Sequence, residues 1–325
     1  MSVQYPIKFV PILQERIWGG SKLTTQLGKE ANDNPIGESW EVSTVPDNIS
    51  VVANGILKGS NLQDLINQYK ADFVGEKVFL QYGTDFPLLI KFIDAKTDLS
   101  VQLHPNDTLA QERHHSFGKE EMWYIMQAEE NSRLLFGFNQ EVSKEKYLEH
   151  LNNQTIPTIL HQEKIKEGAV FHIPTGRVHA IGGGVLLAEI QQSSDVTYRL
   201  YDWERVDKQG KGRELHTELA LDAIDFRVPR SFKTTYESLL NTSSRIVKSP
   251  NFETNILVVD TTYAIAKNNK DTFTIYLCVD GSGTFKTIDF ATPIKKGETI
   301  LIPASLKEYR IQPVESPLKL LQVTP

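Results

Sequence analysis

The feature that most restricts the fold is a series of short segments in which apolar and polar residues alternate, separated by Gly, Pro, Asn and Asp. In the clearest segment, residues 273–279, Phe273, Ile275 and Leu277 fall on one face. A period of two is typical of strands, which β-branched and aromatic residues also favour. The pattern therefore predicts an all-β dominated chain built from antiparallel sheets. Further strands are expected at 39–45, 86–95, 99–105 and 122–128.

Helices are expected to be few and short. Residues 60–75 carry apolar side chains at helical spacing, and Ser60 with Gln63 forms an S-x-x-Q capping box at the start. Shorter helices are predicted at 143–151 and 217–226. Each is expected to lay its apolar side on a sheet.

A weak internal repeat predicts two related β-barrels in tandem. Residues 164–176 resemble residues 293–305 at a constant offset of 129, and both copies contain G-x4-I-P. Self-similarity of this kind indicates a duplicated unit. The stretch 227–252 is rich in Ser and Thr, lacks periodicity and is the expected linker. We therefore expect a first domain over 1–240, with helical additions, and a smaller C-terminal β domain over 241–325.

Histidine is confined to the first part of the chain: all eight histidines precede residue 217. The repeat places His179 opposite Glu308, and Glu121 opposite Phe273. If the first barrel holds a metal ion, the second copy has therefore lost the ligands. The polar stretch 111–119, which includes two of the histidines, is expected to be a loop.

Composition excludes several classes of protein. Among 325 residues there are 35 basic and 41 acidic ones, and a net charge of −6 disfavours binding to nucleic-acid backbones or anionic membranes. The single cysteine, Cys278, permits no intrachain disulfide or thiolate cage and fits a reducing compartment. We see no signal-peptide pattern and no apolar run of about 18 residues that could span a bilayer. A cytoplasmic protein without nucleic-acid or membrane partners is expected.

Three separate segments supply a candidate metal site. Gln102 and His104 lie two apart on one expected strand, so their side chains share a face. Glu121 begins another strand, and His179 ends a G-x5-P-x-G-x2-H pattern. Two imidazoles and a carboxylate suit Zn²⁺ or a similar divalent ion, with a position open to substrate. A single buried histidine or a single solvated glutamate is common in proteins and would not indicate a metal. The prediction rests on the combination of these residues.

These segments resemble a known family. The pattern that ends at His179 is similar to the second motif of the cupin superfamily, and Gln102 stands where the first cupin motif usually has histidine. With this altered first motif, the chain resembles the type I mannose-6-phosphate isomerases (phosphomannose isomerases), particularly their shorter bacterial form. The matching segments are 18–23, 36–43, 87–107, 118–125, 173–185 and 189–207.

The resemblance implies tandem cupin (jelly-roll) β-barrels, with a catalytic metal-binding domain first and a ligand-free copy second. It implies interconversion of mannose 6-phosphate and fructose 6-phosphate through an enediolate, with one Zn²⁺ per chain. The implied ligands are Gln102, His104, Glu121 and His179. Of these, Gln102 is either a direct ligand or an amide set back from the metal.

Five further residues match family positions around a small phosphorylated sugar. Arg199 matches a catalytic arginine, and because it stays cationic we expect it to stabilise the enediolate electrostatically. Glu189 matches an active-site acid. The resemblance does not assign the general base to a particular residue. Ser100 and Lys119 match positions around the phosphate, and Lys91 is expected to join them.

Two alternatives remain open. A cupin metalloenzyme of other chemistry, such as an iron dioxygenase, would also use two histidines and a carboxylate. A non-catalytic sugar-binding cupin would share the fold without turnover, because a fold does not determine a function. Metal analysis with oxygen uptake tests the first alternative, and an isomerase assay tests the second.

Overall fold

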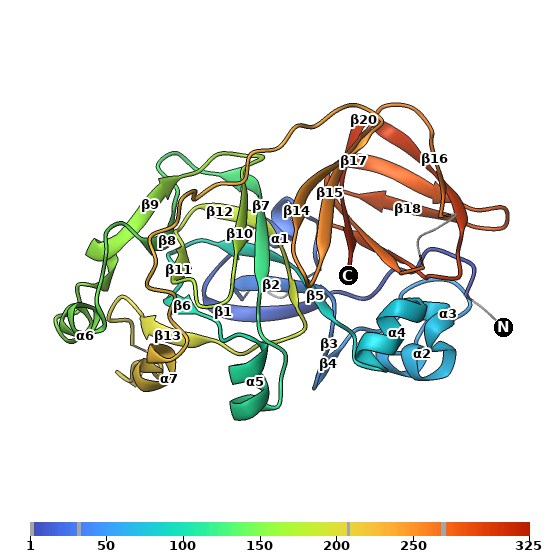
Figure 1. Ribbon diagram of the computed structural model, residues 1–325. Helices are drawn as coiled ribbons and strands as arrows, with labels where there is room; N and C mark the ends of the chain where they lie inside the picture. The colour runs from blue at the N-terminus through green and yellow to red at the C-terminus, as the bar shows by residue number, and fades with distance from the viewer. Residues whose placement is uncertain (1–2, 31–33, 207–208, 268–270) are drawn as a thin grey trace.

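The computed structural model in Figure 1 consists mainly of β-strands, which form two units side by side. The structure describes residues 3–30, 34–206, 209–267 and 271–325. Within these ranges the first unit has a six-stranded and a five-stranded sheet, and the second has a seven-stranded sheet. In the described part of the chain, no helix has the length and apolar character needed to cross a membrane. The predicted all-β dominated fold is confirmed.

The six-stranded sheet is antiparallel and forms the centre of the molecule. Its two middle strands are buried along their whole length, because the second sheet covers one face and the C-terminal unit covers the other. In spatial order the strands are β1 (Ile12–Gly20), β2 (Ile36–Val42), β5 (Leu88–Ala95), β12 (Val185–Gln192), β7 (Glu121–Ala128) and β10 (Val170–Ile173).

The five-stranded sheet packs on the inner face of the six-stranded sheet. Trp123 and Phe171 from one sheet and Phe136 and Ile181 from the other belong to the core between them. In spatial order its strands are β13 (Tyr198–Tyr201), β6 (Val101–Leu103), β11 (His179–Ile181), β8 (Arg133–Phe138) and β9 (Leu160–Lys164). The first unit is thus a sandwich of two sheets.

Short helices cover the outer face of the five-stranded sheet. Tyr147, Ile156 and Ala220 belong to a second core on this outer face, and they come from α6 (Lys144–Asn152), the 3-10 helix η1 (Ile156–Ile159) and α7 (Thr217–Leu221). A further helix, α5 (Asp107–His114), includes residues 111–114 of the expected loop, so that expectation is wrong there, whereas residues 115–119 lie outside any helix or strand. Asn106 caps α5, because its side chain accepts a hydrogen bond from Leu109 N.

The C-terminal unit is filled by its own side chains. Tyr276, Phe285 and Tyr309 are buried inside it, and the two tyrosine hydroxyls hydrogen-bond to each other at 2.8 Å. Its strands are β14 (Ser243–Lys248), β15 (Glu253–Val259), β16 (Tyr263–Ala266), β17 (Thr274–Lys286), β18 (Ala291–Lys295), β19 (Thr299–Ile302) and β20 (Glu308–Thr324).

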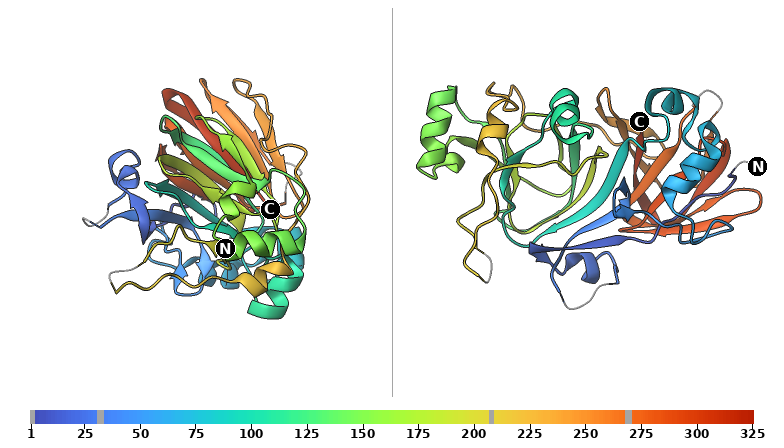
Figure 2. Two further views of the ribbon diagram at one scale, coloured as in Figure 1. Left: turned by 90° about the vertical axis from the view of Figure 1, so that its left-hand side faces the viewer. Right: turned by 90° about the horizontal axis from the view of Figure 1, so that it is seen from below.

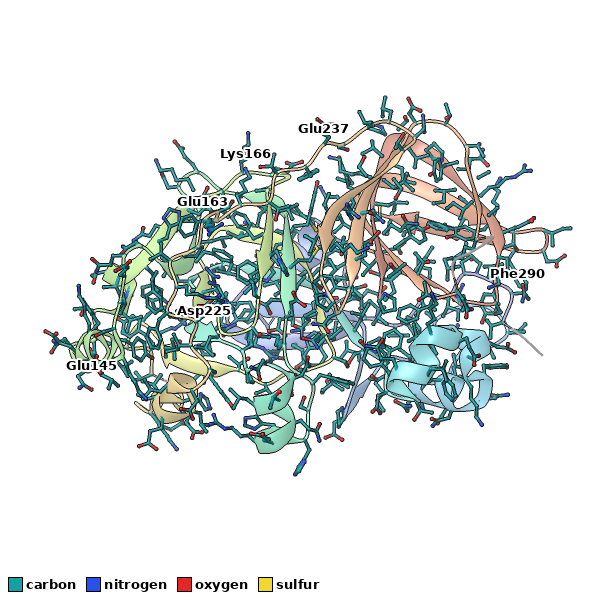
Figure 3. All side chains as sticks on the ribbon, in the orientation of Figure 1. Glu145, Glu163, Lys166, Asp225, Glu237 and Phe290 are labelled. Atoms are coloured by element: carbon teal, nitrogen blue, oxygen red, sulfur yellow. The ribbon has the colours of Figure 1, made fainter. Side chains whose placement is uncertain are left out.

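The two units share an apolar interface. The outer face of the six-stranded sheet, including Ile90 and Tyr124, belongs to one core with Leu277 and Val323 of the C-terminal sheet. A connecting segment, on which Glu237 lies, runs between the units (Figure 3). The expected linker 227–252 is too long at its C-terminal end, since β14 occupies part of it.

The first predicted helix is three short helices: α2 (Leu62–Tyr69), α3 (Ala71–Val74) and α4 (Glu76–Tyr82). The cap of α2 is Asn61 rather than Ser60, because the Asn61 side chain accepts from Asp64 N. These helices lie against the C-terminal unit, where Ala304 N donates to Phe73 O at 2.8 Å (Figure 2). A minor hairpin pairs β3 (Thr44–Val45) with β4 (Asn48–Ile49).

The internal repeat is visible in the structure. Strands β10 and β19 occupy equivalent positions of the two copies, and each pairs with an earlier strand of its unit, β10 with β7 and β19 with β17. Gly168 and Gly297, just before them, have positive φ angles of 78° and 84°, which favour glycine. The register places Thr274, not Phe273, opposite Glu121, one residue away from the sequence alignment.

Candidate metal centre

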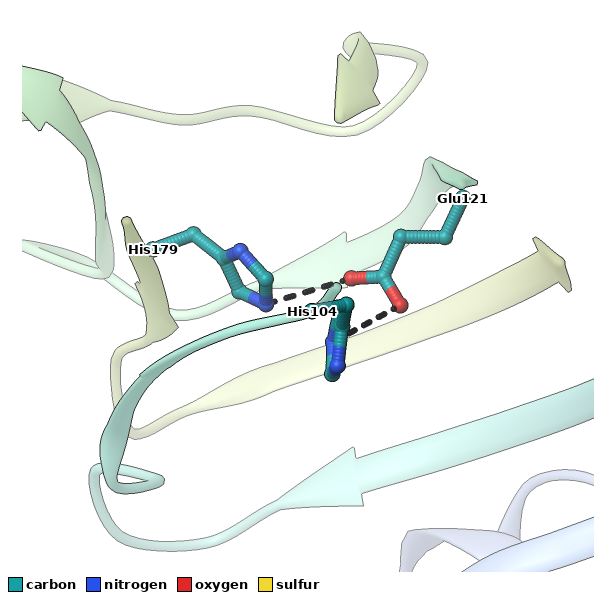
Figure 4. Close-up of side chains that lie close together, drawn as sticks. All are labelled: His104, Glu121 and His179. Carbon is teal, nitrogen blue, oxygen red and sulfur yellow. Dashed lines mark ion pairs between the residues drawn. The ribbon is translucent and has the colours of Figure 1, made fainter. Parts of the chain in front are cut away.

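Two histidines and a glutamate meet at one end of the sandwich. His104 follows β6, Glu121 begins β7 and His179 begins β11, so three strands from both sheets contribute. One ligand atom of each lies within 4.8 Å of the others, and all three side chains are buried (Figure 4). The three residues that the spacing selected are therefore brought together by the fold.

The donor set fits a divalent cation. Glu121 Oε1 lies 3.3 Å from His179 Nε2, and Oε2 lies 3.4 Å from His104 Nε2. The Nδ1 atoms of His104 and His179 lie 2.9 and 2.8 Å from the carbonyl oxygens of Val196 and Arg177. A carbonyl accepts only, so Nδ1 carries the proton and the Nε2 lone pair is directed at the cluster, which is typical of metal-ligating histidines.

The electrostatics keep these ligands deprotonated. Burial, together with the Lys119 ammonium, lowers the pKa of His104 to about 4. Burial also lowers the pKa of His179. Although burial alone would raise the pKa of Glu121, the Lys119 ammonium beside it holds this pKa well below its ordinary value. Neutral imidazoles and a carboxylate are the forms that bind metal ions.

The Gln102 amide lies beside the cluster. Its Nε2 is 3.5 Å from His179 Nε2, and its Oε1 accepts a hydrogen bond of 3.3 Å from the Ser100 hydroxyl. Ser100 and Gln102 are two residues apart and both line the adjoining cavity, which agrees with their expected common face. In this orientation Ser100 holds the amide oxygen, so direct ligation by Gln102 stays a prediction.

Lys119 belongs to the metal centre itself. Its ammonium lies 3.2 Å from His104 Nε2 and 3.3 Å from Glu121 Oε2. The side chain is buried and also lines the cavity. Its charge therefore acts beside the candidate ligands, whereas the sequence placed it at a phosphate remote from them.

Lys91 and Glu189 form a buried ion pair on neighbouring strands. Their charged atoms are 3.1 Å apart, and Glu189 Oε1 also accepts from Trp123 Nε1 at 2.9 Å. The Lys91 ammonium lies 5.1 Å from the centre of the Trp40 ring. Trp123 in turn packs edge-on against His179, with ring centres 5.3 Å apart. These contacts fix the orientation of the side chains on one wall of the site.

A polar cavity of about 540 Å³ adjoins the cluster, and Ser100, Gln102, Lys119, Glu189 and Arg199 all line it. The cavity also has wall residues that the sequence reasoning did not single out. These are Arg16, Trp18, Glu38, Trp40, Asp195 and Arg213, among others. Several of them lie in the segments 18–23 and 36–43, which match the family. The family match therefore pointed to these segments, but no individual residue in them was assigned to the site.

Arg199 lines this cavity without an ion pair to any described residue. It is on β13, paired with Gln102 of β6, and its Nη1 donates to Glu214 O at 2.9 Å. Its Nε is buried without a hydrogen-bond partner among the described residues. Arg16, Lys91, Lys119 and Arg213 each have a carboxylate within ion-pair distance, whereas no described residue provides one for Arg199.

The C-terminal unit has no equivalent cluster among the described residues. Thr274 occupies the position of Glu121, and Glu308 begins β20 as His179 begins β11. Buried tyrosines and a phenylalanine fill its interior. That this second copy binds no metal ion stays a prediction.

The chain is similar to known proteins over nearly its whole length. Residues 7–153 match the family model of the phosphomannose isomerase type I catalytic domain, and 242–317 match that of the mannose-6-phosphate isomerase cupin domain. The mannose-6-phosphate isomerase ManA of Bacillus subtilis is 33% identical, covering 94% of this chain and 96% of the relative. The mannose-6-phosphate isomerase of Streptococcus mutans is 30% identical, covering 92% of both chains.

A solved structure agrees with the fold. The crystal structure of mannose 6-phosphate isomerase from Bacillus subtilis is similar with a TM-score of 0.88 at 33% identity, covering 98% of this chain and 99% of that one. The predicted cupin fold is thereby confirmed, and the iron-dioxygenase alternative finds no support in these relatives. The chain belongs to the type I phosphomannose isomerase (mannose-6-phosphate isomerase) family.

Proposed function

We propose that the protein is a zinc-dependent aldose–ketose isomerase that interconverts mannose 6-phosphate and fructose 6-phosphate. The observation that carries the proposal is the buried His104–Glu121–His179 cluster beside a cavity lined by cationic side chains, in a chain of this family. The single cysteine, Cys278, is free and permits no intrachain disulfide, which fits a reducing compartment, and we place the activity in the cytoplasm.

One Zn²⁺ per chain would be held by His104, Glu121 and His179, and the Gln102 amide, our proposed fourth ligand, lies beside them. A bound divalent cation supplies Lewis-acid stabilisation of negative charge on the oxygens of an open-chain sugar. Three protein ligands with space beside them match a catalytic rather than a closed structural arrangement.

The reaction moves a proton between C1 and C2 of the sugar, and removing that proton leaves an anionic enediolate. Arg199 suits the stabilisation of this charge, because its guanidinium forms no ion pair with a carboxylate of the described residues. Lys119 lies beside the ligand set, so we assign it to the oxygens of the reacting carbons rather than to the distant phosphate.

Glu189 and Lys91 are assigned to the wall of the substrate cavity. Because the Lys91 charge is paired with Glu189, it is less available to a phosphate than an unpaired cation would be. Glu189 remains a candidate proton carrier that Trp123 and Lys91 hold in one orientation. Ser100 is assigned to the Gln102 amide and to a sugar hydroxyl. Its hydroxyl donates a hydrogen bond to the Gln102 amide oxygen and can accept one from the sugar.

A coupled assay tests this function directly. Purified protein should convert mannose 6-phosphate to fructose 6-phosphate, lose that activity after treatment with a chelator, and regain it with Zn²⁺. Metal analysis should give one ion per chain. Sugar-phosphate binding without turnover in the metal-loaded protein would instead identify the non-catalytic alternative.

A further inference from the structure

Glu120 stands between two residues of the metal centre and points away from it. Lys119 and Glu121 contact the cluster, whereas the Glu120 carboxylate lies on the opposite side, as alternation along an extended chain requires. Glu120 is only 7% exposed. Its Oε1 lies 2.6 Å from His172 Nε2, and its Oε2 accepts from Asn251 Nδ2 at 2.6 Å. Both oxygens are therefore held.

Asn251 belongs to the C-terminal unit. It lies in the turn between β14 and β15, and this turn is fixed by the Ser249 hydroxyl, which accepts from the backbone N–H groups of Asn251 and Phe252 at 3.2 Å each. The amide is thus presented to Glu120 from a defined position. Its hydrogen bond spans the interface between the two units.

The backbone of the same segment is anchored to the first unit. Gln192 Oε1 accepts from Glu120 N at 2.9 Å, and Gln192 N donates to Glu120 O at 3.1 Å. Asp107 Oδ1 accepts from Gly118 N at 2.8 Å. The Glu120 side chain adds a contact of a different kind, because it ties this segment to the C-terminal sheet.

We propose that Glu120 is a positioning residue through which Asn251 of the C-terminal unit fixes Lys119 and Glu121 in the metal centre. Hydrogen bonds to a buried carboxylate are strong and directional, so they determine where the start of β7 lies. A shift of this segment displaces both neighbouring side chains relative to the two histidines. The ligand-free unit thereby contributes to a site that it does not line. The activity readout of this inference rests on the proposed function, but its metal readout does not.

The test uses the full-length protein and exchanges the two polar groups. Asn251→Asp places a second carboxylate against Glu120 and should drive the segment away. In the double variant Glu120→Gln/Asn251→Asp, the amide of residue 120 can donate to the new carboxylate while its oxygen still accepts from His172. Glu298→Gln is the matched control, because it removes the 2.8 Å ion pair of Lys8 with Glu298, a contact of the C-terminal unit away from the metal centre.

The readouts are Zn²⁺ affinity by chelator competition, the absorption spectrum of the Co²⁺-loaded protein, and kcat and KM. We expect Asn251→Asp to weaken Zn²⁺ binding by about tenfold, the lower end for residues that orient ligands. It should also alter the Co²⁺ spectrum and lower kcat more than it raises KM. The double variant should recover most of the affinity, and Glu298→Gln should match the unsubstituted protein.

Unchanged Zn²⁺ affinity and Co²⁺ spectrum in Asn251→Asp would overturn the proposal, as would an equal loss in Glu298→Gln. If Asn251→Asp does not fold, Asn251→Ala removes the donor without adding charge and is judged by the same criteria. If the unsubstituted protein binds Zn²⁺ but has no isomerase activity, the proposed function fails, while the metal measurements still decide the role of Glu120.

Discussion

The Lys119 ammonium lies 3.3 Å from Glu121 Oε2, two residues along the same chain segment. Both side chains are buried, and the ammonium is also 3.2 Å from His104 Nε2. A cation so close to the ligand set lowers the pKa of Glu121 and of His104, and so favours their metal-binding forms. It also brings a positive charge to the place where the reaction would create a negative one.

Replacing Lys119 distinguishes this role from phosphate binding. Lys119→Met keeps the length of the side chain and removes the charge. We expect Zn²⁺ to be retained and kcat to fall by about 100-fold, the size seen when one group that stabilises a developing charge is lost. Metal analysis and steady-state kinetics with mannose 6-phosphate measure both quantities. A large rise in KM with kcat unchanged would instead indicate that Lys119 binds the phosphate.

The two histidines should be required for metal and activity together. His104→Ala or His179→Ala removes a ligand nitrogen from a cluster of three, so we expect loss of bound Zn²⁺ and of turnover in parallel. Glu308→Ala is the control, because it changes the position equivalent to His179 in the ligand-free copy. Its metal content should stay at one ion per chain. Full Zn²⁺ occupancy with normal turnover in either histidine variant would contradict the ligand assignment.

Arg199 should affect chemistry without affecting metal. Arg199→Ala removes the cation that has no carboxylate partner among the described residues, while the three ligands stay in place. We expect full metal content and a fall in kcat of about 100-fold. Arg199→Lys should restore only part of the activity, since an ammonium does not reproduce the guanidinium geometry. An unchanged kcat in Arg199→Ala would remove Arg199 from the mechanism.

The candidate metal-binding residues could be selected from the sequence because most of them have a local signature. Gln102 and His104 show strand spacing, and the Gly and Pro residues before His179 indicate a turn. By contrast, Lys91 and Glu189 face each other only because β5 pairs with β12 in one particular register. No local pattern encodes that pairing, so the ion pair emerged only from the tertiary structure.

A helix that has too few apolar residues to show a helical period was also missed. Helix α5 consists mostly of polar residues, so periodicity did not identify it, although the capping residue Asn106 was a usable signal. Ser60 and Asn61 are both good capping residues, and the structure uses the second. The contact from Asn251 to Glu120 joins residues 131 positions apart and depends on how the two units dock.

The low pKa of His104 predicts how the metal-stripped protein responds to acid. Burial and Lys119 lower this pKa from 6.5 to about 4 in the folded protein. In the unfolded chain the imidazole takes up a proton near 6.5. Between these values the unfolded state binds more protons, so the free energy of unfolding decreases as the pH falls from 6.5 toward 4. At pH 7 the residue is mostly neutral in both states, so this contribution is small.

Equilibrium unfolding in urea at pH 7 and pH 5, after removal of metal, measures this effect. For the unsubstituted protein, His104 should account for a loss of about 2 kcal/mol between the two pH values, since one pKa unit corresponds to about 1.4 kcal/mol. The side chain of residue 104 in His104→Gln takes up no proton, so the free energy of unfolding of this variant should fall correspondingly less between pH 7 and pH 5. All other titrating groups are common to both proteins. Equal losses in the two proteins would mean that His104 titrates normally, and that its Nε2 is not held in the neutral, metal-binding form by burial and Lys119.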